Sequence, residues 1–131
     1  MWIDEEEYIA IYQEFVTRFP EPMPEGVDFP LEPPDLGPNM IGLGNAEGAA
    51  YFHWNCAWMD VYLTDTDAAT RDRAMEQLRA FPTTEWALKY VEDPENGYLG
   101  VLDEAELGDL SGLREVYVSG CTDALGAAEE G

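Results

Sequence analysis

The sequence predicts a small all-α domain, a bundle of about four to five helices around a buried, aromatic-rich central helix. Two segments, 3–19 and 47–63, place apolar residues at helical spacing. Between them, residues 20–45 carry seven prolines and four glycines, which exclude a regular helix or a central strand. At 131 residues and 46% apolar composition, the chain has the size of one domain with a substantial core.

The central segment 47–63 is apolar on most of its circumference, so we expect it to be surrounded by protein. Stepped at 100° per residue, its apolar side chains form two adjoining stripes. These are Tyr51, Trp54, Trp58 and Tyr62 on one, and Phe52, Cys56, Met59 and Leu63 on the other. Buried Asn55 would need hydrogen-bond partners. The segment is too short and too polar to span a bilayer, which takes roughly 20 mostly apolar residues.

The first helix is expected within residues 3–19. Asp4 is a suitable N-cap, Glu7 completes a capping box, and Ile3 is placed to pack on Tyr8. Pro20 ends the segment. The inward face is expected to consist of Tyr8, Ile9, Tyr12, Phe15, Val16 and Phe19.

Residues 20–46 are expected to form an ordered strap, rich in proline and glycine, that lies along the helices. Eight apolar residues between Met23 and Leu43 supply side chains for this packing. The alternative is a proline-rich ligand for an aromatic groove, because Pro30 and Pro33 have PxxP spacing. Its flanks are acidic, however, unlike those of the usual ligands of this kind.

A further helix is expected to follow a cap in residues 64–67 and to end before Pro82. Asp67 and Arg71 have the spacing of a favourable helical pair. We expect its inward side chains to be Ala68, Met75, Leu78 and Phe81. A short helix capped by Thr83 or Thr84 should then run to Asp93-Pro94.

The C-terminal third is harder to assign. Asn96-Gly97 indicates a turn, and residues 98–102 resemble a short strand. Asp103 and Glu106 suggest a capping box for a single helical turn ending at Gly108. Ser111 is a possible cap for a last helix through Tyr117, although residues 113–118 also fit a strand. Residues 1–121 are expected to form the globular domain and 122–131 a frayed acidic tail.

The net charge of −22, from 28 acidic and six basic residues, restricts the possible partners. Such a surface repels nucleic acid and anionic membranes, and it favours basic proteins, cations or high salt. Genomic GC bias or a halophilic origin would also produce this composition. The candidate partner-binding residues lie in the first helix and the strap: Glu5, Glu6, Glu7, Glu14, Glu21, Glu25, Asp28, Glu32 and Asp35.

Cys56 and Cys121 are the only cysteines. They would close a long loop if bridged, but two buried thiols have the same sequence signature. No signal peptide is visible at Met1, and a chain already trimmed to its mature form would show none, so the sequence leaves both cytoplasmic and exported locations open.

Three segments contain residues that are candidates for chemistry. His53, Asp60 and Thr64 share the polar stripe of the central helix and form a possible pocket, yet Asp60 lies about 10 Å along the axis from His53, too far to orient a general base. The glycines in 42–48 lack the spacing of a dinucleotide-binding loop. Residues 93–104 match an EF-hand only at three acidic positions, Asp93, Glu95 and Glu104. No metal ligand set and no cofactor are predicted.

The sequence therefore favours a non-enzymatic acidic interaction domain that binds a basic protein surface. A specific form is an inhibitor or immunity-like protein for a nucleic-acid-binding partner. The alternatives are an exported or cell-surface accessory domain stabilised by a Cys56–Cys121 disulfide, and a small hydrolase or metal-binding protein that uses His53.

Overall fold

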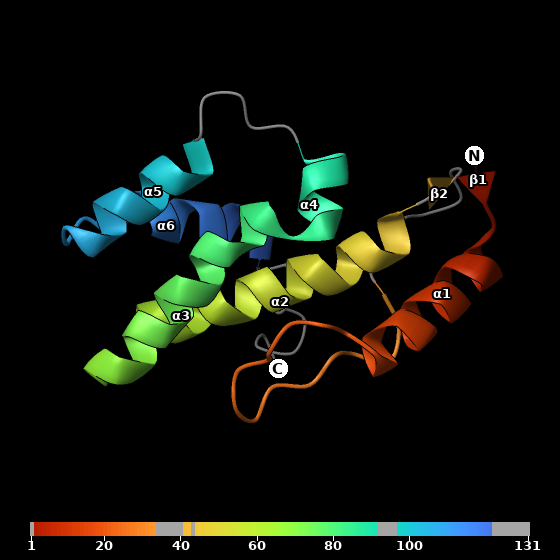
Figure 1. Cartoon of the computed structure of the whole chain (residues 1–131), viewed down its shortest axis with the longest axis horizontal. Helices are drawn as coiled ribbons and strands as arrows, with labels where there is room; N and C mark the ends of the chain where they lie inside the picture. Colours follow the sequence, from red (N-terminus) through yellow and green to blue (C-terminus); the bar gives the residue numbers. More distant parts are fainter. Residues whose placement is uncertain (1, 34–40, 43, 92–96, 122–131) are drawn as a thin grey trace.

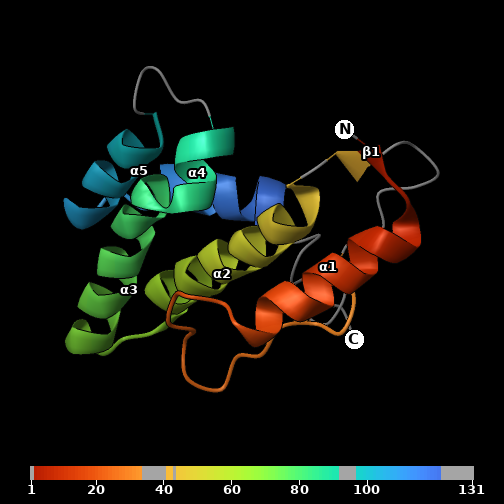
Figure 2. The ribbon, with the colours of Figure 1, turned by 45° about the vertical axis from the view of Figure 1, so that its right-hand side comes forward.

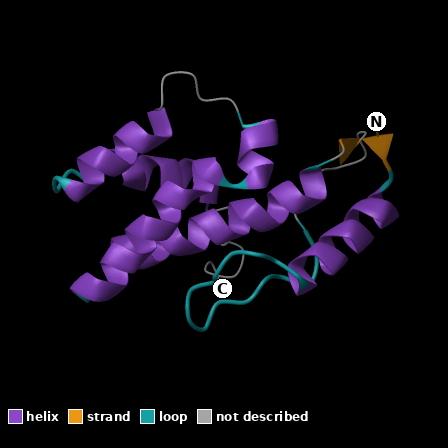
Figure 3. Cartoon of the chain, viewed as in Figure 1, coloured by secondary structure: helices purple, strands orange, loops and turns teal. Residues whose placement is uncertain are grey.

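Helix α2 (Asn45–Thr64) is the axis of the computed structural model, and the other helices are arranged around it (Figure 1). The structure describes residues 2–33, 41–42, 44–91 and 97–121. In these residues almost all regular structure is helical, which confirms the predicted all-α class (Figure 3). Helix α1 packs on one side of α2, and α3 lies along another.

Six α-helices are described, one more than expected. Besides α2, they are α1 (Glu5–Thr17), α3 (Ala68–Ala80), α4 (Glu85–Tyr90), α5 (Gly97–Glu106) and α6 (Ser111–Val116). A 3-10 turn (Phe81–Thr83) joins α3 to α4, and a π-helical turn (Tyr117–Cys121) extends α6. Two short antiparallel strands, β1 (Trp2–Ile3) and β2 (Ile41–Gly42), bring the end of the strap to the start of the chain.

Three of the predicted caps are present. The carboxylate of Asp4 accepts from the Glu7 amide, and that of Asp67 accepts from the Thr70 amide. Thr84, rather than Thr83, caps α4. Each cap satisfies one of the amides that the first turn of a helix leaves unpaired, which is why these residues mark the helix starts so reliably.

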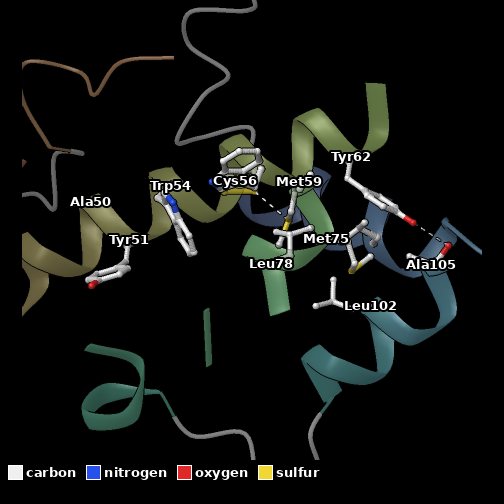
Figure 4. Packing of buried hydrophobic residues seen from close by; sticks show 14 of the residues in the cluster. Ala50, Tyr51, Trp54, Cys56, Met59, Tyr62, Met75, Leu78, Leu102 and Ala105 are labelled. Carbon is white, nitrogen blue, oxygen red and sulfur yellow. Dashed lines mark hydrogen bonds between the residues drawn. A yellow bond between two sulfur atoms is a disulfide. The ribbon is translucent and has the colours of Figure 1, made fainter. Parts of the chain in front are cut away.

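The core is centred on α2. Trp54 and Trp58 are 0% and 3% exposed, as predicted, and further along α2 other buried side chains pack against those of α3 and α5 (Figure 4). Buried Asn55 has its partner, because its side-chain oxygen lies 2.9 Å from the Tyr98 hydroxyl. The prediction was wrong for Phe52, which is 44% exposed. Protein covers the first apolar stripe of α2 but only part of the second.

Helix α5 corrects the expected strand at 98–102. Gly97 and Gly100, with β-forming Tyr98 and Val101, hide the helical pattern, but burial decides the outcome because Leu102 and Ala105 pack into the core. Asp103 and Glu106 are not a capping box; both carboxylates pair with the Arg79 guanidinium from α3. Tertiary contacts thus override the local signal.

Smaller corrections concern α3 and α6. Ala68 is exposed rather than inward. Arg71 does not bind Asp67; its Nε donates to the Tyr62 carbonyl at 3.0 Å, and its guanidinium lies over the Tyr62 ring. The segment 111–121 is helical throughout, and Leu110 rather than Ser111 occupies its cap position.

Cys56 and Cys121 form a disulfide that joins the middle of α2 to the end of the π-helical turn, across 65 residues. Both cysteines are buried, at 0% and 2% exposure, and the bridge lies inside the core (Figure 4). The sequence left bridged and free cysteines open, and the structure decides for the bridge.

The first described part of the strap, residues 20–33, leaves the end of α1 and turns back beside it (Figure 2). The Pro22 carbonyl accepts from the indole N–H groups of Trp54 and Trp58, at 2.8 and 3.0 Å. The Pro30 carbonyl accepts from the Tyr12 hydroxyl at 2.8 Å. Residues 34–40 and 43 lie outside the described residues, so the strap as a whole stays a prediction.

Candidate partner-binding surface

The outer side of α1 and the strap carries most of the predicted partner-binding residues at the surface. Seven of these nine are exposed: Glu5, Glu6, Glu7, Glu14, Glu25, Asp28 and Glu32. We call these seven residues the acidic N-terminal surface. Of the other two, Glu21 is half-buried and accepts a hydrogen bond from the Tyr51 hydroxyl at 3.4 Å, whereas Asp35 lies outside the described residues.

Little of this charge is neutralised within the described chain. The described ion pairs involve three carboxylates, and only Glu14, which faces Arg18 at 3.7 Å, belongs to the acidic N-terminal surface. That pair is exposed on both sides, and exposed pairs of this kind contribute roughly 0–1 kcal/mol. The surface therefore retains a strong negative potential.

The backbone beneath this surface is firmly held. Tyr8, Tyr12 and Phe15 bury the inner face of α1, and Gln13 Nε2 donates to the Leu31 carbonyl at 3.0 Å. These contacts and this hydrogen bond involve only uncharged groups, so the carboxylates of the surface are not needed to hold α1 in place. Fixed carboxylates on a rigid helix present a defined pattern of charge to a partner.

A hollow of about 420 Å³ adjoins this surface where α1 ends. It lies between the C-terminal end of α1, the start of α2, and α4. We call it the aromatic hollow. Its lining residues are Phe15, Arg18, Pro20, Glu47, Tyr51, Glu85, Trp86, Lys89 and Tyr90.

Two glycines, Gly44 at the N-cap of α2 and Gly48 in its first turn, allow the rings of α4 to approach. A Cβ at Gly48 would lie 2.5 Å from Trp86 Cζ2, and one at Gly44 would lie 2.6 Å from the Tyr90 ring. Gly44 also has φ of +95°, which favours glycine, and its carbonyl accepts from Trp86 Nε1 at 3.0 Å. The glycine-rich approach to α2 thus makes room for aromatic rings, a packing role that the sequence did not reveal.

Sequence patterns do not predict the aromatic hollow, because its residues come from three distant segments. Two local signals point toward it. Gly44 and Gly48 are one helical turn apart, as are Trp86 and Tyr90, so two small positions face two rings. Neither signal shows which segments meet.

The possible pocket residues are engaged by different partners. His53 lies under the strap, and its Nε2 is 3.1 Å from the Asp28 carbonyl. Asp60 accepts from the Tyr117 hydroxyl at 3.1 Å, and the Thr64 hydroxyl donates to the Asp60 carbonyl at 2.7 Å. The hollows found among the described residues are lined by other side chains, and the pocket at these three residues stays a prediction.

His53 is buried, and its Nδ1 has no hydrogen-bond partner among the described residues. Nε2 carries the hydrogen if it donates to the Asp28 carbonyl, which leaves Nδ1 as an unprotonated acceptor. Burial lowers the pKa of His53, and the hydrogen bond to Asp28 opposes this only in part. The ring is therefore a neutral contact between α2 and the strap.

The other candidates for chemistry are the Cys56 thiol and clusters of metal-ligating side chains. Cys56 is bridged and has no thiol for catalysis or metal binding. Within the described ranges, no group of three or more His, Cys, Asp or Glu side chains is placed to hold a metal ion. Asp93 and Glu95 of the EF-hand comparison lie outside the described residues.

Scans against protein-family models, curated proteins and solved structures give no match to this chain. Among the described helices, none has both the length and the apolar character needed to cross a membrane.

Proposed function

We propose that this protein is a non-enzymatic interaction domain that binds a basic protein surface through its acidic N-terminal surface. The observation that carries the proposal is the exposed, unneutralised row of Glu5, Glu6 and Glu7 at the start of a helix whose inner face is locked into the core. Among the described residues from 4 to 33, nine are acidic and Arg18 alone is basic.

Charge of one sign on a fixed scaffold accelerates encounter with a partner of opposite sign and orients it. The acidic row at the N-terminus of α1 is also stabilised by the helix dipole, so it does not disturb the helix that presents it. A basic partner would find these carboxylates already in place. In its specific form, the domain occupies the nucleic-acid-binding surface of such a partner as an inhibitor or immunity-like protein.

The test is capture of basic proteins from native lysate on the immobilised domain, followed by elution with rising salt. Glu5, Glu6, Glu7 and Glu14 are replaced together by Gln. The matched control replaces Asp72 by Asn and Glu76, Glu104 and Glu115 by Gln, which removes the same charge from exposed positions on α3, α5 and α6.

We expect the captured partner to bind the N-terminal variant about tenfold more weakly at low salt, and the control nearly as tightly as the unaltered chain. Equal binding by both variants, or binding that does not depend on salt, would contradict the proposal. Circular dichroism checks that both variants keep the helical fold.

A second candidate function is supported by the Cys56–Cys121 bridge. Buried disulfides are typical of proteins in oxidising compartments, so the domain would then be an exported or cell-surface accessory module. Mass measurement of the alkylated protein from its native source, with and without reductant, tests this. Two alkylated thiols before reduction would contradict it.

A further inference from the structure

The aromatic hollow has a wall of stacked rings. Tyr51 stacks on Trp86, with centroids 5.9 Å apart and planes within 16°. Trp86 continues to Tyr90 at 5.5 Å, and Phe15 meets Tyr51 at 6.0 Å on the α1 side. Tyr51 and Phe15 belong to the core, whereas Tyr90 is 41% exposed, so the wall runs from the interior to solvent.

Two of the six basic residues of the chain lie at this hollow, and each covers one of its rings. The Arg18 guanidinium is 5.3 Å from the centre of the Phe15 ring, and Lys89 Nζ is 5.4 Å from that of Tyr90. The π faces of these rings thus already attract cations, as expected from the negative face of an aromatic ring. Both cationic side chains are on exposed residues, so both can turn away into water.

Carboxylates outnumber these cations around the hollow. Glu47 and Glu85 line it, Glu21 accepts from the Tyr51 hydroxyl, and Glu14 faces Arg18. The pKa of Tyr51 responds to this setting: burial first, and then the nearby carboxylates of Glu21 and Glu85, together raise it to about 12. A negative field favours a cation over an anion in the same space.

We propose that the aromatic hollow is a binding site for a cationic side chain, a lysine or arginine of the partner, which enters between α1 and α4 and displaces the chain's own Arg18 and Lys89 from the rings. This inference rests on the proposed function, since it names the anchor of the basic partner. The rings bind the apolar stem and the charged head, while Glu47 and Glu85 pair with the head. The exposed Glu14 extends the site toward the acidic N-terminal surface.

An anionic ligand in the hollow would give the opposite result when Arg18 and Lys89 are removed. If Arg18 and Lys89 were the ligands, the hollow would bind an anionic group, and their removal would abolish binding. If they compete with an incoming cation, their removal strengthens binding. The sign of this one change separates the two.

The experiment follows the Trp86 indole N–H by nuclear magnetic resonance in the full chain, with the signal assigned from Trp86→Phe. The probes are N-acetyl-arginine amide, its uncharged isostere N-acetyl-citrulline amide, and anionic N-acetyl-glutamate amide. We expect the arginine probe to shift the Trp86 signal saturably and the other two to shift it at least several-fold more weakly at equal concentration.

In the variant with Arg18→Gln and Lys89→Gln, the arginine probe should bind several-fold more tightly. The matched control is Arg73→Gln with Arg114→Gln, which makes the same charge change at exposed positions on α3 and α6 and should strengthen binding less. If the arginine probe bound both variants equally more tightly, only the overall negative charge would be responsible. That result would overturn the proposed site.

Two further variants address the wall and the carboxylates. Tyr90→Leu leaves the net charge unchanged and should weaken the arginine probe several-fold, as should Glu47→Gln with Glu85→Gln. Thermal unfolding confirms that each variant folds. A preference for the glutamate probe that vanishes without Arg18 and Lys89, or no shift of Trp86 with any probe, would overturn the proposal.

The captured partner separates this inference from the proposed function. A partner that loses affinity with the α1 variant but binds Tyr90→Leu unchanged would contradict the anchor and leave the acidic surface intact. A partner unaffected by the α1 variant but weakened by Tyr90→Leu would contradict the acidic surface instead.

Discussion

The segments before and after α2 in the chain are held in the fold by different kinds of interaction. We call residues 4–33 the N-terminal side and the described residues that follow α2 the C-terminal side. On the N-terminal side, residues 4–33 are held by ring packing and by hydrogen bonds from neutral side chains to backbone carbonyls of the strap. On the C-terminal side, a disulfide and the hydroxyls of Tyr98 and Tyr117 make the polar and covalent ties to α2, and the Arg79 ion pairs join α3 to α5. Neutral ties leave the carboxylates of the first side free for a partner.

The distribution of basic residues follows the same division. Arg71, Arg73, Arg79 and Arg114 lie on the C-terminal side, where Arg79 joins α3 to α5. The N-terminal side has only Arg18 among its described residues. We therefore expect salt to weaken the C-terminal ion pairs and partner binding, while the attachment of α1 and the strap changes little.

The largest predicted effect is on the C-terminal side. Removing the bridge in a Cys56→Ala, Cys121→Ala variant should lower the free energy of unfolding by about 4 kcal/mol, because the bridge closes a loop across 65 residues. Urea unfolding with and without reductant measures this loss. A loss below about 1 kcal/mol would show that the bridge contributes little to holding the C-terminal side.

The second-largest predicted effect is the loss of the hydrogen bonds that join the N-terminal side to α2. Replacing both Trp54 and Trp58 by Phe leaves the Pro22 carbonyl without its two indole donors and should cost about 2–5 kcal/mol, including lost packing. Each single variant should cost less than half as much, since the other indole still bonds. Urea unfolding of the three variants gives the coupling, and strictly additive losses would show that the shared carbonyl contributes nothing.

The smallest expected effect is the pH dependence of the contact that His53 makes between α2 and the strap. The pKa of His53 is lowered by burial, so its neutral form stabilises the contact with the strap above the ordinary pKa of about 6.5, and this stability is lost as the pH falls through the lowered value. The unaltered chain should lose stability on acidification more steeply than His53→Gln. Parallel pH profiles of the two, from urea unfolding between pH 7 and about pH 5, would contradict this assignment.

Sequence patterns predicted the parts of the fold that depend on neighbours along the chain. The caps at Asp4, Asp67 and Thr84 and the buried Trp54 follow from local chemistry and from the period of the helix. They required no knowledge of which segments meet.

The failures all depend on distant contacts. Tyr98 belongs to a helix because its side chain packs into the core: its hydroxyl lies 2.7 Å from the Leu78 carbonyl and 2.9 Å from the Asn55 side-chain oxygen, and its ring packs on Phe81. His53, placed on a polar stripe by the helical wheel, is buried because the strap covers it. The aromatic hollow joins three segments, so spacing within any one of them could not reveal it.

The double acceptor at Pro22 fixes the length of the connection that contains it. Surface connections usually tolerate added or deleted residues. Here one residue inserted between Phe19 and Pro22 would move the carbonyl by about 3.3 Å along an extended chain, out of reach of both indoles. The number of residues between α1 and Pro22 is therefore fixed by the hydrogen bonds to α2. Variation in this length should be as poorly tolerated as a deletion within a helix.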